Sequence, residues 1–203
     1  MTNYIDYINS TLKPRTTEKE IVLDLFAGCG GLSLGFEAAG YKTIGYEMET
    51  AAAATYGKNL NGDCFAVKLD LDFEYPEAEI IIGGPPCQPF SVGGHQKGIE
   101  DARDGFPIFI DAVKKLHAYA REAGKESAVH SLYIRIDDEE ELRKRFKERG
   151  DSPEETEARI AECRAWNQQA KDSGIPFIYL EARKKREEIL ADALAAIQKH
   201  VHP

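Results

Sequence analysis

The sequence predicts an α/β fold of the Rossmann-like kind, a three-layer sandwich in which a mostly parallel sheet is flanked by helices. Short apolar runs typical of strands alternate along the chain with longer segments of helical spacing. Several of these runs end in glycine or proline, residues that stop strands. Parallel strands in such a sheet are joined by right-handed crossovers.

We expect strands in the first part of the chain at 21–26, 42–47, 64–70 and 79–86. We expect helices there at 4–12, 32–40, 48–60 and near 107–122. The run IVLDLF (21–26) is apolar almost throughout and ends in glycines, which indicates a buried parallel strand. The helix at 32–40 closes on Gly40, a residue type favoured just past a helix C-terminus.

In the second part we expect strands at 131–136 and 175–182, and helices at 137–150, 152–174 and 184–200. The helix at 137–150 begins with acidic residues and ends with basic ones, an order that complements the helix dipole. Ser152 and Pro153 are suited to the N-cap and first position of the next helix. We predict one domain over residues 1–203, with the later strands added beside the earlier ones.

The charge of the chain argues against a strong nucleic-acid binder. Residues 1–116 hold 10 Lys and Arg against 17 Asp and Glu, and the whole chain carries a net charge of −9. No apolar run is long enough to cross a membrane, and the N-terminus lacks the layout of a signal peptide. We therefore expect a cytoplasmic protein. The four cysteines show no metal-ligand spacing, so we expect no metal site.

Candidate ligand-binding residues lie where predicted strands end. The glycines of DLFAGCGG (24–31) would let a nucleotide-like ligand approach the backbone after the first strand. Glu47 ends the second strand and could accept hydrogen bonds from ribose hydroxyls, or it could be a solvated loop glutamate. Asp70 ends the third strand and could accept from an adenine amino group or cap a turn.

The fourth strand runs into GGPPCQPFS (83–91), which contains a candidate nucleophile. Most lone cysteines are inert small hydrophobic residues. Here rigid prolines present Cys87 at the ligand edge of the sheet, a semi-exposed position that suits a reactive thiolate.

These motifs, followed by QKGIEDARDG (96–105), resemble cytosine-5 DNA methyltransferases over about residues 20–116. The resemblance implies S-adenosylmethionine as cofactor and DNA as partner. It implies that the Cys87 thiolate adds to C6 of a flipped-out cytosine, whose C5 then takes the methyl group. By the same resemblance, the substrate-binding residues are Ser91, Gln96 and Arg103. The cofactor-binding residues that it implies are Phe26, Gly28, Gly30, Leu32, Glu47, Met48, Asp70 and Pro85.

After Leu116 the chain departs from that family. The Glu-Asn-Val motif, the Gln-x-Arg-x-Arg segment and the target-recognition region are absent, as is the C-terminal Asn-containing motif. A carboxylate from 137–139 could replace the missing glutamate, although acidic residues that open a helix have a sufficient structural reason.

The segment from about 125 to 203 resembles the lid and C-terminal part of guanylate kinase-like P-loop kinases. That resemblance would bring Arg145, Arg149 and Arg159 near phosphates, but these residues could equally pair with neighbouring glutamates. No Walker A motif is present, so we exclude ATP-dependent phosphoryl transfer. Two resemblances in one chain suggest a hybrid, recombined or engineered; the alternative is a natural, degenerate methyltransferase relative.

We therefore expect an S-adenosylmethionine-binding, cytosine-5 methyltransferase-like segment with little or no turnover. The alternatives are an active DNA (cytosine-5) methyltransferase and a nucleotide-binding module without a Walker A loop.

Overall fold

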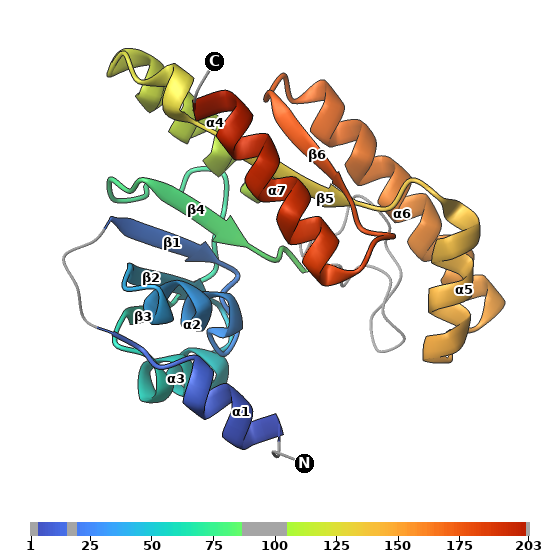
Figure 1. Ribbon diagram of the computed structural model, residues 1–203, viewed down its shortest axis with the longest axis horizontal. Coiled ribbons are helices and arrows are strands. Elements are labelled where there is room, and N and C mark those ends of the chain that lie inside the picture. Colours follow the sequence, from blue (N-terminus) through green and yellow to red (C-terminus); the bar gives the residue numbers. More distant parts are fainter. Residues whose placement is uncertain (1–3, 16–19, 87–104, 202–203) are drawn as a thin grey trace. The chain divides into compact units, whose positions relative to one another are not determined.

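The computed structural model describes most of the chain as two compact units (Figure 1). The described residues are 4–15, 20–86 and 105–201. Among them, the first unit holds the residues up to Pro86 together with Gly105–Ala112, and the second begins at Val113. Each unit is described by itself below.

A parallel sheet of four strands forms the centre of the first unit (Figure 1). Its strands are β1 (Ile21–Leu25), β2 (Lys42–Glu47), β3 (Asp63–Ala66) and β4 (Ile80–Gly83), in the order β3-β2-β1-β4. The helices of this unit are α1 (Tyr4–Thr11), α2 (Gly31–Ala38), α3 (Thr50–Asn59) and the start of α4 (Phe106–Glu122). α2 packs on β1 and β2, and α3 packs on β2 and β3. The Rossmann-like α/β fold predicted from the sequence is thereby confirmed.

The core of the first unit forms around β1. Val22, Leu23 and Leu25 are almost completely buried, as the apolar run predicted. A cluster built on Leu23, Leu25, Tyr46, Leu69 and Ala112 continues this core. Because β1 pairs with β2 on one side and with β4 on the other, hydrogen bonds hold its C-terminal end from both sides.

The second unit contains a sheet of its own, in which β5 (Ser131–Arg135) and β6 (Phe177–Glu181) pair in parallel. The sequence had led us to expect these strands beside those of the first part. Instead, all five residues of β5 are in register with β6, so each strand supplies the hydrogen-bonding partner of the other. The prediction of a single domain remains a prediction.

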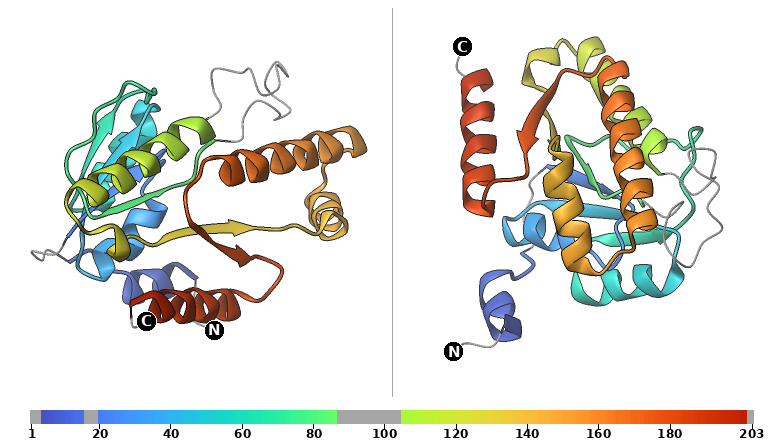
Figure 2. Two further views of the ribbon diagram at one scale, coloured as in Figure 1. Left: turned by 90° about the horizontal axis from the view of Figure 1, so that it is seen from above. Right: turned by 90° about the vertical axis from the view of Figure 1, so that its right-hand side faces the viewer.

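The helices of the second unit begin and end where local signals predicted. They are the second half of α4, α5 (Glu139–Arg149), α6 (Pro153–Asp172) and α7 (Arg186–Val201), with a 3-10 turn at Glu126–Ala128. Asp138 caps α5, Ser152 and Glu155 form a capping box on α6, and Gly150 ends α5 in the left-handed region. α5 packs on α6 and α7 on β6 (Figure 2). In the described part of the chain, no helix has the length and apolar character that spanning a membrane requires.

Candidate cofactor site

A glycine turn follows β1 and leads into α2. Phe26, Gly28 and Gly30 all have positive φ, of 61°, 56° and 87°. A Cβ atom on Gly30 would lie 2.3 Å from Leu60 Cδ1 and 2.7 Å from Tyr56 Cδ2. Glycine is therefore required at position 30 both for its backbone conformation and for the close approach of these two side chains.

Glu47 lies beside this turn, at the end of β2. β1 and β2 are neighbours, with Leu25 opposite Tyr46, so the segments that follow them share one edge of the sheet. The carboxylate of Glu47 accepts a hydrogen bond from Gly28 N at 2.9 Å and another from Glu49 N at 2.8 Å. Each oxygen keeps a lone-pair direction for a further donor, such as a hydroxyl group.

Two large apolar side chains are exposed close to these residues in the sequence. Leu32, in the first turn of α2, is 53% exposed, and Met48, directly after β2, is 55% exposed. Phe26 is half-buried and packs near Gly105. Apolar groups of this size at the edge of a sheet offer a surface on which the flat ring of a ligand can lie.

The other predicted cofactor residues lie in segments that follow strands of the same sheet and have less distinctive surroundings. Asp70 is exposed, and its Oδ1 accepts from Asp72 N at 3.1 Å, which is the turn-capping contact. Pro85 follows β4 and is half-buried. Thus Glu47 is the predicted residue that the structure ties directly to the glycine turn.

The predicted nucleophile and the residues expected around the target base lie outside the described residues. They are Cys87, Ser91, Gln96 and Arg103.

Polar residues behind the glycine turn were missed by the sequence reasoning. Asp24 lies within the apolar run of β1 and is 1% exposed. Burial, partly offset by hydrogen bonds from Ser33 and reinforced by the charge of Glu47, raises the pKa of Asp24 to about 6. A charged residue inside an otherwise apolar strand was the available signal.

The arginines that we had considered as phosphate ligands pair with acidic residues. Arg145 donates to Glu141 at 2.7 Å and to the carbonyl oxygen of Ala182 at 3.1 Å. Arg149 and Arg159 both pair with Asp151. These contacts agree with the alternative that we had considered, in which the arginines pair with neighbouring acidic residues.

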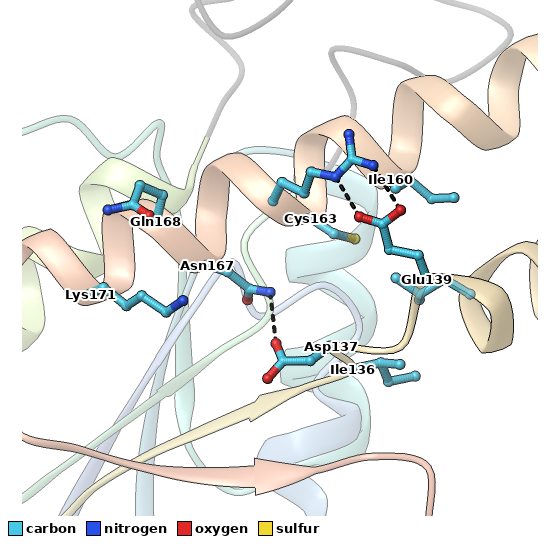
Figure 3. Close-up of a pocket in the computed structure, with 10 residues that line it drawn as sticks. Ile136, Asp137, Glu139, Ile160, Cys163, Asn167, Gln168 and Lys171 are labelled. Atoms are coloured by element: carbon cyan, nitrogen blue, oxygen red, sulfur yellow. Dashed lines mark hydrogen bonds and ion pairs between the residues drawn. The ribbon is translucent and has the colours of Figure 1, made fainter.

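A hollow of about 260 Å³ in the second unit lies between α6 and the residues that follow β5 (Figure 3). Arg164 donates to Glu139 at 2.7 Å, and Asn167 lies 3.4 Å from Asp137. Asp137 is also paired with Arg135. The acidic residues that follow β5 and open α5 thus have structural partners, as has the N-cap Asp138.

Comparison with known proteins identifies the first part of the chain. Residues 21–121 match the family of C-5 cytosine-specific DNA methylases. The type II methyltransferase M.AplI of Arthrospira platensis is 54% identical over 116 residues, which are 56% of this chain and 34% of that protein. M.NgoPII of Neisseria gonorrhoeae is 38% identical over 111 residues, which are 51% of this chain and 31% of that protein. M.HaeII of Haemophilus aegyptius is 36% identical over 113 residues, which are 53% of this chain and 36% of that protein.

The chain spans about a third of the length of these curated relatives. None of these matches supports the predicted kinase-like segment or a hybrid origin, which stay predictions from the sequence. The methyltransferase resemblance, expected over about 20–116, is confirmed. Residues 21–121 of the chain therefore belong to the C-5 cytosine-specific DNA methylase family.

Proposed function

We propose that the first unit binds S-adenosylmethionine over the glycine turn after β1, and that the chain by itself transfers little or no methyl to DNA. The observation that carries this proposal is the position of the Glu47 carboxylate, hydrogen-bonded to Gly28 N within the turn. A carboxylate held beside a glycine turn is suited to the two hydroxyl groups of a ribose.

The residues present fit this cofactor. Backbone with positive φ at Gly28 and Gly30 allows close approach to the methionine part, and the exposed Leu32 and Met48 provide apolar surface for the adenine. Glu47 would hold the ribose, with Phe26, Asp70 and Pro85 completing the set. When bound, the cofactor supplies an activated methyl group.

The proposed chemistry on DNA rests on the sequence and the family. Cys87 would be the nucleophile that adds to C6 of a flipped-out cytosine, and Ser91, Gln96 and Arg103 would contact the base. Low turnover is proposed because residues 117–140 lack the Glu-Asn-Val motif and because the net charge is −9.

Cofactor binding is tested by isothermal titration calorimetry with S-adenosylmethionine. Wild-type protein should bind saturably, and Glu47→Ala should weaken binding about 10- to 100-fold, as expected for loss of hydrogen bonds to a charged acceptor. Glu49→Ala is the matched control, because Glu49 is an exposed glutamate two residues away whose side chain makes no cap for α3. We expect that control to change the dissociation constant less than about twofold.

A folded wild-type protein that gives no saturable heat would refute the cofactor proposal. Equal losses in the Glu47 and Glu49 variants would refute the assigned role of Glu47.

Turnover is tested by transfer of a labelled methyl group to DNA. We expect no transfer above background. Transfer that is lost in Cys87→Ser would instead establish the alternative, an active DNA (cytosine-5) methyltransferase.

A further inference from the structure

Behind the glycine turn, five polar side chains touch in an unbroken row, which we call the buried polar chain (Asp24, Ser33, Tyr56, Thr43 and Glu37). Ser33 Oγ lies 2.8 Å from Asp24 Oδ2 and 2.9 Å from Tyr56 Oη. Thr43 Oγ1 lies 2.7 Å from Tyr56 Oη and 2.6 Å from Glu37 Oε1. All five residues are at most 1% exposed, so water does not replace any of these contacts.

The number of hydrogens in the buried polar chain decides whether one of its carboxyl groups is protonated. There are four short oxygen–oxygen contacts, and a hydrogen bond at each of them needs one hydrogen. The three hydroxyl groups of Ser33, Tyr56 and Thr43 supply only three hydrogens. If both carboxyl groups at the ends are ionised, one contact has no hydrogen. One additional proton on a terminal carboxyl group completes the chain.

Glu37 is the accepting end. Its oxygens accept hydrogen bonds from Asn61 N and Gly62 N, each at 2.8 Å, in addition to the Thr43 contact. A proton on Glu37 would compete with these three donors.

Asp24 has the opposite surroundings. Its second oxygen, Oδ1, is buried and has no hydrogen-bond partner in the described part of the chain. The titratable groups that interact with it are Glu47 of β2, Tyr56 of α3 and Cys64 of β3. None of these groups is a cation, so none favours a negative charge on Asp24.

We propose that Asp24 is a neutral carboxylic acid in the folded protein at mildly acidic pH, where an ordinary aspartate is ionised, and that it donates its proton to Ser33. The donation then runs in one direction, from Asp24 through Ser33, Tyr56 and Thr43 to the accepting oxygens of Glu37. This proposal concerns the folded protein alone and does not depend on cofactor binding.

The buried polar chain makes Asp24 a positioning residue for the glycine turn. Asp24 precedes the turn on β1 and Ser33 follows it on α2, so their hydrogen bond closes the turn at its base. The ring of Tyr56, held by two of the contacts, packs directly under Gly30. Burial, reinforced by the charge of Glu47, raises the pKa of Asp24 to about 6 in spite of the hydrogen bonds of Ser33, in the direction that the hydrogen count requires.

The direct test is carbon-13 NMR of the side-chain carboxyl carbons of wild-type protein labelled at Asp and Glu. The Asp24 signal is assigned by its loss in Asp24→Asn. We expect its titration midpoint above about pH 5, whereas an ordinary aspartate titrates near 4. A midpoint at or below about pH 5, or a midpoint in the neutral range on Glu37 in place of Asp24, would overturn the proposal.

Two amide variants give an independent test, because each replaces a buried carboxyl group with an amide of nearly the same size. The amide of Asp24→Asn can donate to Ser33 as the neutral acid does, so the midpoint of thermal unfolding at neutral pH should be equal to or higher than that of wild type. Glu37→Gln places an amide group against three donors and should lower the midpoint. A lower midpoint in Asp24→Asn at neutral pH would count against a position where Ser33 accepts a hydrogen from residue 24.

The pH dependence has a defined sign. Because the folded-state pKa of Asp24 is raised above its unfolded value, this group stabilises the fold at low pH, and that contribution is lost as pH rises from about 4 to about 6. Asp24→Asn does not lose stability in this way, because an amide does not ionise. The stability of the variant relative to wild type should therefore increase across that range in denaturant titrations, and a decrease would contradict the proposal.

Discussion

In the first unit, the polar side chains of the buried polar chain lie behind the glycine turn and are closed to water, whereas α5 and α6 of the second unit carry arginine–glutamate pairs on exposed surfaces. The first region consists of hydroxyl and carboxyl hydrogen bonds out of contact with water, and the second of ion pairs in contact with water. A buried donor or acceptor that loses its partner has no water to replace it, and the fold bears the full cost. An exposed ion pair exchanges one partner for water at little cost.

The two units should therefore be sensitive to substitution in different places. Polar groups next to the candidate cofactor site should behave as part of the core of the first unit. The more numerous ion pairs of the second unit should contribute to solubility and local helix geometry more than to stability.

The largest effect is expected for Glu37→Gln. The variant leaves the amide hydrogens of Asn61 and Gly62 and the Thr43 hydroxyl facing a group that is itself partly a donor. We expect a loss of about 3 kcal/mol in the free energy of unfolding, measured in urea. The control is Glu49→Gln, an exposed glutamate, and equal effects in the two variants would remove the distinction between buried and exposed groups.

A somewhat smaller effect is expected for Gly30→Ala. Its new methyl group would meet Leu60 and Tyr56 well within contact distance, on backbone with φ of 87°. We expect a loss of about 2 kcal/mol in the free energy of unfolding, from overpacking and backbone strain together. Gly31→Ala is the matched control, because a Cβ at that position has nothing within 4 Å. If the neighbouring variant loses as much, the close approach under Gly30 is not the cause.

Tyr56→Phe should have a moderate effect. It removes the hydroxyl that joins the two halves of the buried polar chain while keeping the ring that packs under Gly30. We expect a loss of about 1 kcal/mol in the free energy of unfolding. Tyr119→Phe, at a half-exposed tyrosine of α4, should be close to neutral. No loss in Tyr56→Phe would show that Ser33 and Thr43 do not depend on this hydroxyl.

The smallest effect is expected for Arg143→Ala. Arg143 bridges Glu157 at 2.7 Å and Glu139 at 3.3 Å, on the exposed side of α5 and α6. Because water and salt screen such pairs, the loss in the free energy of unfolding should be smaller than in Glu37→Gln, Gly30→Ala or Tyr56→Phe and should shrink further in high salt. Lys144→Ala is the neighbouring control. A salt-independent loss as large as that of Glu37→Gln would show that the second unit depends on these pairs.

Most of the elements could be predicted from local patterns, and the differences have physical causes. A strand was expected at 64–70, but β3 ends at Ala66, opposite Glu47, because its partner β2 ends there. A strand was also expected over 79–86, but β4 ends at Gly83, opposite Leu25, where β1 ends and prolines follow. Strand length is a property of the pair, so one strand's sequence does not define it.

The candidate site shows the same division. The glycines after β1 and the carboxylate after β2 could be predicted, because parallel strands bring their carboxyl ends to one edge of the sheet. The hydrogen bond from Gly28 to Glu47 depends on the register of β1 and β2, which no local pattern specifies.

The α/β class, the place of the glycine turn and the family of residues 21–121 follow from the sequence alone, because each depends on short-range patterns. The meeting of Asp24, Ser33, Tyr56, Thr43 and Glu37 in the buried polar chain follows from the tertiary structure. These residues come from β1, β2, α2 and α3, and each is an ordinary polar residue in its own segment. Side chains far apart in sequence form hydrogen bonds only where helix packing and strand register bring their atoms within about 3 Å.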